Sequence, residues 1–292
     1  MKKCMVILNP SSGKEQALQY EQLIVSQFTD YDVKICYTEK EGDATAFAKQ
    51  ACEAQFDAVV LVGGDGTLNE GVNGIAEQAH RPTIGVVPLG TVNDFARALH
   101  IPLEPEEAIA LLGGHTEAAD IGKVNERYFT NIVAIGEIAQ SVGDVSIEEK
   151  SKIGAWAYLK EGIKVAISPT TFHITLQIDG ETIEEEAYLF LCVLTNSVGS
   201  FQQMNAEADV ADGLLHIFIL KGERLLDVAF TAKNLLSGQY DEDERIIKLQ
   251  AQELSVSLDR PYELNVDGDN VSSLPAKIQL LPQHLTFYCE KM

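Results

Sequence analysis

A glycine-rich segment directly after an apolar run constrains the fold of this chain more than any other feature. Residues 58–62 are all apolar, and they lead into Gly63-Gly64-Asp65-Gly66-Thr67 and then a helix-like segment at 68–76. A strand, a glycine loop and a helix in this order present backbone N–H groups to a bound phosphate. The alternative interpretation is a tight strand-to-helix turn that binds nothing.

The composition of this segment narrows the kind of ligand. Glycine lets the backbone approach an anion closely and adopt positive φ values. The segment is neither a G-x-G-x-x-G motif nor a P-loop. Asp65 at its centre would repel a bare phosphate, so we expect a divalent cation, or water bound to one, between the carboxylate and the phosphate.

The first 120 residues alternate short apolar runs with helical patterns, which predicts a parallel sheet covered by helices on both faces. In the segment 15–28, Leu18, Leu23, Ile24, Val25 and Phe28 follow roughly helical spacing. Ligands bind such sheets beyond the carboxyl ends of the strands. Three loops at this edge carry glycine with Asn, Ser, Thr or Asp, namely 9–13, 63–67 and 88–93. The predicted strands are 4–8, 33–37, 58–62 and 83–87, and the predicted helices are 15–28, 43–54, 68–76, 94–99 and 105–112.

From about residue 128 the pattern changes to that of a mainly antiparallel β domain, as a sandwich or half-barrel. Asp179-Gly180 is typical of a hairpin turn. The predicted strands are 172–178, 187–194, 215–220, 254–258, 262–266 and 278–281, and the helical interruptions are 153–166 and 224–236.

Charge and cysteine usage exclude several classes of function. The net charge of −22 argues against nucleic-acid binding, which relies on Lys and Arg to neutralise phosphates. No apolar run reaches the ~18–20 residues that a membrane span needs. The five cysteines are scattered and form no C-x-x-C pair, which predicts reduced thiols, a cytoplasmic protein and no structural zinc.

Several motifs in register resemble the diacylglycerol kinase catalytic-domain family, which includes sphingosine and ceramide kinases and is more distantly similar to NAD kinases and phosphofructokinases. The string Gly90-Thr91-Val92-Asn93-Asp94-Phe95-Ala96-Arg97 resembles the lipid-kinase branch and not the NAD kinases. The likeness spans the whole chain and is closest to the soluble bacterial diacylglycerol kinases. The other matching motifs are Asn9-Pro10-x-Ser12-Gly13-Lys14, Ala119-Asp120-Ile121-Gly122, Phe129-x-Asn131, Ala211-Asp212-Gly213-Leu214-Leu215 and Leu264-Asn265-Val266-Asp267-Gly268-Asp269.

The resemblance implies an α/β nucleotide-binding domain over residues 1–125, rejoined by 285–292, and a β-sandwich-like domain over 126–284. It implies an ATP- and Mg²⁺-dependent kinase that phosphorylates a lipid hydroxyl, with diacylglycerol as the leading acceptor. Such an enzyme would be cytoplasmic and act transiently at the inner face of the membrane. Exposed strand edges in the second domain favour a homodimer. The alternatives are a kinase of a sphingoid base, ceramide or phosphatidylglycerol, an NAD kinase, and a non-catalytic lipid or nucleotide sensor.

The resemblance also assigns residues to ATP. The side chain of Lys14 either adds a positive charge near the phosphates or is an ordinary surface lysine. The nucleotide-binding residues implied in this way are Asn9, Ser12, Gly13, Thr38, Gly63, Gly64, Asp65, Gly66, Thr67, Asn69 and Thr91.

Three carboxylates carry the implied catalytic roles. Asp267 matches the general base, although an Asp-Gly pair is also a common hairpin turn. Asp65 and Asp94 match the pair that organises a catalytic Mg²⁺, and Asp94 is also well placed as a helix N-cap. Asp269 stands where the family usually has Glu, so the role of that side chain does not carry over directly.

A second, structural Mg²⁺ is implied in the β domain. The resemblance assigns it to Asp209, Asp212 and the carbonyl of Leu214. The alternative is an Asp-x-x-Asp-Gly turn without a cation.

Overall fold

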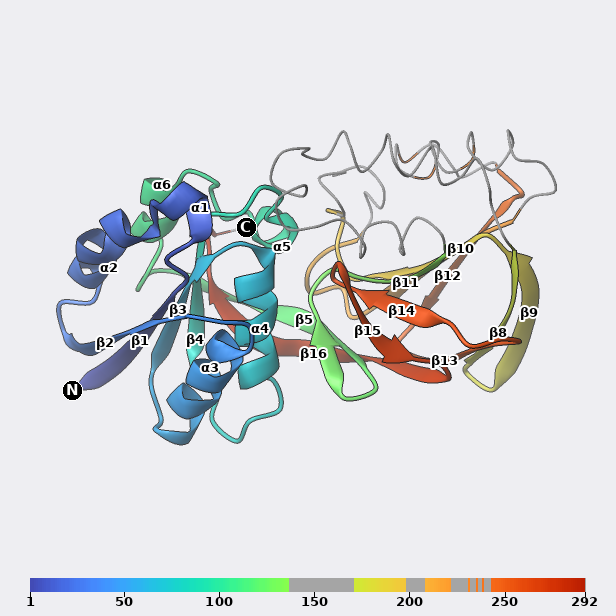
Figure 1. Ribbon diagram of the computed structural model, residues 1–292, viewed down its shortest axis with the longest axis horizontal. Helices are drawn as coiled ribbons and strands as arrows, with labels where there is room; N and C mark the ends of the chain where they lie inside the picture. Colours follow the sequence, from blue (N-terminus) through green and yellow to red (C-terminus); the bar gives the residue numbers. More distant parts are fainter. Residues whose placement is uncertain are drawn as a thin grey trace. The chain divides into compact units, whose positions relative to one another are not determined.

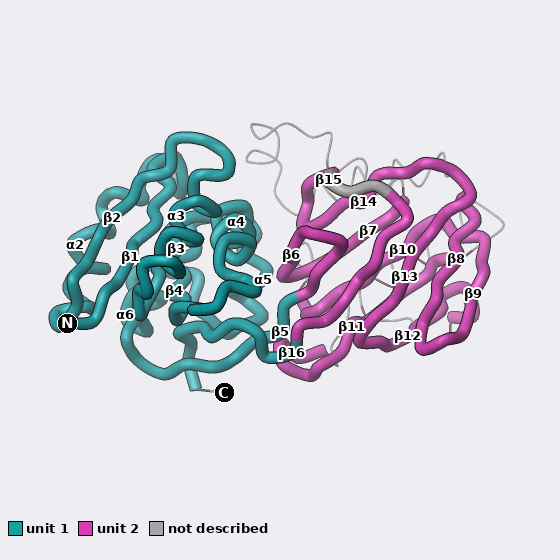
Figure 2. Tube along the Cα trace, turned by 90° about the horizontal axis from the view of Figure 1, so that it is seen from below, with its two compact units in different colours: residues 1–121, 282–292 teal, residues 122–281 magenta. Residues whose placement is uncertain are grey.

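The computed structural model describes residues 1–136, 171–197, 208–221, 231, 235, 238 and 243–291. The chain forms two compact units, residues 1–121 with 282–292 and residues 122–281 (Figure 2). The helix predicted at 153–166 lies outside the described residues. So does the one predicted at 224–236, apart from Thr231 and Leu235, which are helical.

The first unit is built on a parallel sheet with the strand order β2-β1-β3-β4-β16 (Figure 1). Strand β3 is buried along its whole length, as expected for a parallel strand that is covered on both faces. The strands are β1 (Lys2–Leu8), β2 (Tyr31–Tyr37), β3 (Ala58–Gly63), β4 (Thr83–Pro88) and the C-terminal part of β16 (Ala276–Tyr288).

Helices cover both faces of this sheet. On one face, Val60 and Val62 pack with Ile24 and Ile109 in one buried cluster. On the other face, Gly71 lies close against Leu61, so that α4 packs on β3. The helices are α1 (Ser12–Glu15), the 3₁₀ helix η1 (Ala17–Tyr20), α2 (Glu21–Gln27), α3 (Asp43–Glu53), α4 (Asp65–Ile75), α5 (Asp94–Ala98) and α6 (Pro105–Ala110).

The single helix predicted at 15–28 is wrong, because this stretch contains a break and two kinds of helix. Glu15 has a φ of 69°, which ends α1, and η1 precedes α2. The apolar spacing was also misread, since Leu18, Leu23 and Val25 are exposed. The buried side chains are those of Ala17, Tyr20, Ile24 and Phe28.

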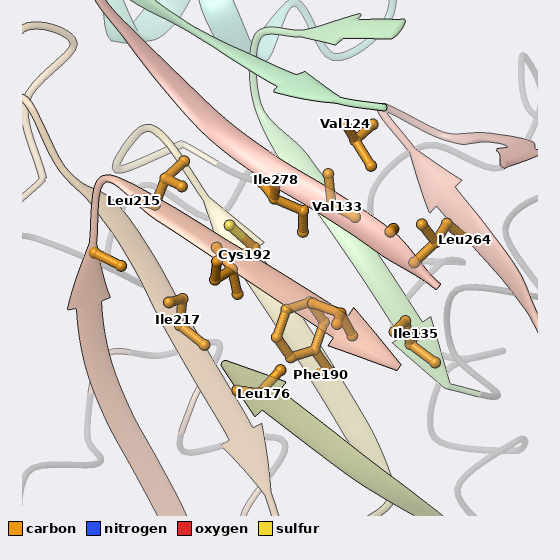
Figure 3. Packing of buried hydrophobic residues seen from close by; sticks show 14 of the residues in the cluster. Val124, Val133, Ile135, Leu176, Phe190, Cys192, Leu215, Ile217, Leu264 and Ile278 are labelled. Carbon is orange, nitrogen blue, oxygen red and sulfur yellow. The ribbon is translucent and has the colours of Figure 1, made fainter. Parts of the chain in front are cut away.

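The second unit is a β-sandwich. One layer is an antiparallel sheet in the order β12-β11-β10-β7-β14-β15, and the other contains β16, β13, β8 and β9. Figure 3 shows side chains of both layers, such as Phe190 and Leu176, meeting in one buried core. These strands are β7 (Ile132–Gly136), β8 (Phe172–Ile178), β9 (Glu181–Ala187), β10 (Leu189–Val193), β11 (Leu215–Leu220), β12 (Ile246–Ala251), β13 (Glu253–Leu258), β14 (Glu263–Val266) and β15 (Asp269–Ser273).

The predicted fold class is confirmed, with a parallel α/β first unit and an antiparallel β second unit. The predicted strand at 187–194 is two elements, since β9 ends at Ala187 and β10 begins at Leu189. The strand predicted at 278–281 is a fragment of the much longer β16. Strands β5 (Thr116–Val124) and β6 (Arg127–Phe129) pair with each other and were not predicted.

All five cysteines are buried as free thiols, and burial suppresses their reactivity. Burial raises the pKa of the Cys4 thiol to about 12 and also raises the pKa of the fully buried Cys192. Because the thiolate is the reactive form, a raised pKa leaves less of it at pH 8. We expect iodoacetamide to label both thiols far more slowly in the native protein than in guanidinium, as measured by peptide mass spectrometry. Equal labelling rates in the two conditions would contradict this burial.

Candidate active site

The three glycine-bearing loops of the first unit follow β1, β3 and β4, whose ends lie level with one another. Leu8 pairs with Val62, and Gly63 pairs with Pro88, so the three loops leave the sheet at the same edge. In Figure 1 this is the upper edge of the sheet, where α1 and α5 also lie. The carboxyl ends of parallel strands are where such sheets bind their ligands.

Direct hydrogen bonds join the loops. The amide of Asn9, after β1, donates from Nδ2 to the Thr67 hydroxyl at 3.4 Å. The backbone N–H of Leu89, after β4, donates to the carbonyl of Gly63 at 2.8 Å. Thr38 lies at the same edge, because its N–H donates to the carbonyl of Leu8 at 2.9 Å. The loops therefore form one connected structure.

The glycines at the end of β3 and the start of α4 allow close packing. Gly64 is the N-cap of α4, which begins at Asp65, three residues before the predicted start. A Cβ on Gly63 would lie 2.3 Å from the Thr67 hydroxyl oxygen, and one on Gly64 would lie 3.0 Å from the Cα of Gly90. The expectation of positive φ values does not hold for Gly63, Gly64 or Gly66, since none of them has one.

Asp65 connects the loop after β3 to the loop after β4. Its Oδ2 accepts the backbone N–H of Asn93 at 2.8 Å, and its Oδ1 accepts that of Asp94 at 3.0 Å. These donors are at the start of α5, where unpaired N–H groups and the helix dipole favour a negative charge. Asp65 thus supports the second loop through both of its oxygens.

Asn93, and not Asp94, is the N-cap of α5. Asn93 adopts the left-handed conformation with a φ of 54°, and Asp94 is the first helical residue. The Asn93 side chain accepts the N–H of Gly90 at 3.0 Å and donates to the Gly90 carbonyl at 2.8 Å. Asp94 is buried, at 8% exposure, and its backbone N–H is bound by Asp65. The two residues assigned to the catalytic metal are therefore in direct contact, through the backbone N–H of Asp94.

The remaining nucleotide candidates differ in their positions. Ser12 and Gly13 belong to α1 after β1, and Thr91 is an exposed residue in the loop after β4. Asn69 lies within α4, where it is buried and its carbonyl and Oδ1 accept the amide of Asn73 at 2.9 and 3.1 Å. The side chain of Asn69 therefore forms a hydrogen bond within α4. The side chain of Lys14 lies outside the described part of the structure.

Replacing Asp65 by Asn should weaken this connection even in the ligand-free protein. One amide oxygen can still accept an N–H, but the new NH₂ group faces the other donor. We expect the free energy of unfolding, measured by urea denaturation without ATP or metal, to fall by about 1–2 kcal/mol. Asp32→Asn on β2 is the matched control, because it removes the same charge from an exposed position. Equal stability of the two variants would contradict the role of Asp65.

The second unit holds the other predicted carboxylate, in a hairpin turn between β14 and β15. Asp267 and Gly268 have φ values of 49° and 96°, so the Asp-Gly pair forms the tight turn that was the alternative interpretation. The side chain of Asp267 also accepts four hydrogen bonds from residues 130–132. Asp267 Oδ2 accepts the N–H and the hydroxyl of Thr130 at 2.8 and 3.2 Å. Its Oδ1 accepts the N–H groups of Asn131 and Ile132 at 3.0 and 2.8 Å.

Asp269, which replaces the usual Glu, is paired with a cation in this chain. Its Oδ2 lies 2.7 Å from Nη2 of Arg127, on β6. The Asp269 side chain is 58% exposed, so solvent screens the pair and its contribution to stability is small. The ion pair joins β15 to β6 next to the Asp267 turn.

Comparison with known proteins assigns the family. Residues 3–124 match the model of the diacylglycerol kinase catalytic domain, and residues 135–289 match that of the YegS C-terminal NAD kinase beta sandwich-like domain. The chain belongs to the diacylglycerol kinase catalytic-domain family. It is therefore an enzyme of the kinase type, as the motifs predicted, and membership implies ATP as the co-substrate.

Relatives in this family match over nearly their whole length. A diacylglycerol kinase of Staphylococcus epidermidis is 37% identical over 293 residues, which covers 99% of this chain and 93% of that protein. One of Bacillus subtilis is 36% identical, covering 98% and 95%. A crystal structure of a diacylglycerol kinase from Bacillus anthracis superposes with a TM-score of 0.84 at 28% identity, covering 99% of this chain and 97% of that one.

The residues that the family resemblance assigned to a structural metal form a hydrogen-bonded turn. Asp212 accepts the N–H groups of Asp209 and Leu214 at 3.2 and 2.9 Å. Its Oδ2 also lies 2.8 Å from Nε2 of the buried His216. Burial acts to raise the pKa of Asp212, but the hydrogen bonds from His216 and from the two backbone N–H groups outweigh it and hold this pKa below its usual value.

The hydrogen bonds of this turn occupy part of the acceptor positions of its two carboxylates. Both Asp212 oxygens accept hydrogen bonds, and Asp209 Oδ1 accepts the N–H of Ala211 at 3.0 Å. Within the described ranges, no group of three or more His, Cys, Asp or Glu side chains is arranged to hold a metal ion. The structural Mg²⁺ at Asp209, Asp212 and Leu214 therefore stays a prediction.

Sequence reasoning missed the residues that hold Asp267. In the segment 129–132 only Phe129 and Asn131 match a family motif, and no sequence signal indicates the hydrogen-bonding role of Thr130.

Among the described residues, no helix has the length and apolar character needed to cross a bilayer.

Proposed function

We propose that this chain transfers the γ-phosphoryl group of ATP to the hydroxyl of a lipid, in the first place diacylglycerol, giving phosphatidic acid and ADP. The observation that carries the proposal is the set of three glycine-bearing loops at one edge of the parallel sheet, connected by the hydrogen bonds of Asn9 and Asp65. Such loops expose backbone N–H groups and hydroxyls, which are the donors that phosphates need.

The nucleotide would be held by residues of these loops and of the first turn of α4. Asn9, Gly64 and Thr67 stand where backbone or side-chain donors meet the sheet edge. Both oxygens of Asp65 already accept N–H groups, but a carboxylate has about four acceptor positions. Asp65 and Asp94 would therefore hold Mg²⁺ largely through its water ligands, as Mg²⁺ prefers. The ion supplies neutralisation of the phosphate charge.

Asp267 would accept the proton of the lipid hydroxyl. As the hydroxyl oxygen forms its bond to the γ-phosphorus, the bridging bond to the β-phosphate oxygen breaks and ADP leaves. The hydroxyl proton moves to the carboxylate of Asp267. Phosphoryl transfer of this kind depends mainly on positioning and charge stabilisation, so a base held rigidly by its neighbours suits it.

A panel of acceptors tests which molecule is phosphorylated. The relatives are named for diacylglycerol, whereas the model matching residues 135–289 is described as NAD kinase-like. The panel therefore contains micelles of diacylglycerol, sphingosine, ceramide and phosphatidylglycerol, together with NAD⁺ as a soluble acceptor. With γ-labelled ATP and Mg²⁺ we expect most of the label in phosphatidic acid. Label in NADP⁺ alone, or in no acceptor, would contradict the proposal.

The charge of the chain predicts how its transient association with a membrane depends on salt. With a net charge of −22, an anionic surface repels the protein, and salt screens this repulsion. We therefore expect binding to vesicles of phosphatidylglycerol and diacylglycerol to hold or increase from low to physiological salt at fixed Mg²⁺. Co-sedimentation measures this directly. Steep release with increasing salt would show instead that a local Lys/Arg surface governs the association.

A further inference from the structure

The carboxylate of Asp267 is bound by a short segment that is distant in sequence. Three successive backbone N–H groups, of Thr130, Asn131 and Ile132, point at its two oxygens at 2.8 to 3.0 Å. Successive N–H groups of this kind form a concave anion site. In turn, the N–H of Asp267 donates to the carbonyl of Ile132 at 2.9 Å, which fixes the turn to β7 from both sides.

The fourth donor to this carboxylate is the hydroxyl of Thr130. Its Oγ1 lies 3.2 Å from Asp267 Oδ2, and Thr130 is 2% exposed. A hydroxyl can rotate and can either donate or accept. The contact alone therefore does not decide whether the proton of Thr130 points at Asp267.

Asn131 decides the direction of that hydroxyl. Its Nδ2 donates to Thr130 Oγ1 at 3.4 Å, which occupies a lone pair of the oxygen and directs the hydroxyl proton to Asp267. The side chain of Asn131 is buried, at 6% exposure, and among the described residues its Oδ1 has no hydrogen-bond partner. A buried amide with an unpaired oxygen is unfavourable for folding, so stability alone does not explain an Asn here.

We propose that Thr130 and Asn131 are positioning residues for Asp267. Asn131 orients the Thr130 hydroxyl, and that hydroxyl, with the three backbone N–H groups, fixes the carboxylate of Asp267 in one rotamer. The inference deepens the proposed function and rests on Asp267 being the proton acceptor there. Asp269, two residues further along the chain, is paired with Arg127.

The first test compares two replacements of Thr130. Thr130→Val keeps the shape and removes the hydroxyl, whereas Thr130→Ser keeps the hydroxyl. We expect kcat to fall about tenfold in Thr130→Val and to stay within about twofold of wild type in Thr130→Ser, with the KM for ATP unchanged in both. Equal activity of the two variants, whether high or low, would overturn the role of the hydroxyl.

The second test separates positioning from structural support. Asn131→Leu removes the amide together with its unpaired oxygen, so the melting temperature should be equal to or higher than that of wild type. Its kcat should nevertheless fall as in Thr130→Val. A variant that loses stability and activity together would show that Asn131 is a structural residue, and one that keeps full activity would also overturn the proposal.

The third test does not depend on turnover, so it separates this inference from the proposed function. The ¹³C carboxyl resonance of Asp267, assigned by its loss in Asp267→Asn, is followed as a function of pH. Removing an O–H donor disfavours the ionised carboxylate, so the titration midpoint in Thr130→Val should move to higher pH than in wild type or Thr130→Ser. An unchanged midpoint would overturn the inference, even if the protein phosphorylates diacylglycerol. A shifted midpoint in a protein that phosphorylates no lipid would leave the positioning intact and refute the function.

Discussion

Replacing Asp267 by Asn should lower kcat for lipid phosphorylation by about 10²–10⁴, with the affinity for ATP little changed. The amide cannot accept the proton of the hydroxyl. It also turns an NH₂ group toward one pair of the N–H and O–H donors that the carboxylate accepts. The nucleotide loops belong to the other unit and keep all their own contacts. Steady-state kinetics and calorimetric titration with ATP measure the two effects separately.

The chain provides a matched control for this substitution. Asp179-Gly180 is a second Asp-Gly hairpin, between β8 and β9, with φ values of 52° and 84°. Asp179→Asn makes the same chemical change in the same kind of turn and should leave activity at the wild-type level. Near-normal turnover of Asp267→Asn on its best lipid would show that Asp267 is not the general base.

Replacing Gly64 by Val should abolish measurable nucleotide binding while the protein remains folded. A Cβ at this position already lies 3.0 Å from the Cα of Gly90, and the two methyl groups of Val would push the loops after β3 and β4 apart. The backbone donors for the phosphates would move with them. Calorimetry with ATP, on protein shown by circular dichroism to be folded, measures the loss.

A second glycine of the same helix separates binding from stability. A Cβ on Gly74 would lie 2.5 Å from the carbonyl of Thr45, so Gly74→Ala disturbs the packing of α3 on α4 and not the loops. It should lower the melting temperature and leave the ATP affinity of the folded protein unchanged. Unchanged ATP affinity in folded Gly64→Val would exclude the loops as the phosphate site.

The strands with continuous or alternating apolar patterns could be predicted from the sequence. Strands β8 and β11 have the predicted bounds, because Phe172–Ile178 alternates and Leu215–Leu220 is apolar except for His216. Strands β12 and β15 lacked this signal. Strand β12 is mostly half-exposed along its length, and β15 is a polar return strand whose pairing depends on the Asp267 turn.

The motifs identified the chemistry of the site but not its contacts. The sequence placed Asp65 in the loop after one predicted strand and Asp94 at the start of the helix that follows the next loop. The structure adds that Asp65 caps the start of α5. The donors to Asp267 are 135 to 137 residues away from it in sequence, so no local spacing could reveal them. Local spacing also could not reveal the close contact of Gly64 with Gly90, because this contact depends on the pairing of β3 with β4.

The proposed lipid kinase activity is tested most directly by following the transferred phosphoryl group. In one sample of protein, ATP, Mg²⁺ and diacylglycerol micelles, ³¹P NMR resolves the γ-phosphate of ATP, inorganic phosphate and the monoester of phosphatidic acid. We expect the monoester signal to rise as the γ-phosphate signal falls, one for one, with ADP as the other product. Loss of γ-phosphate to inorganic phosphate alone, or no change in either signal with any acceptor of the panel, would contradict the claim that this chain is a lipid kinase.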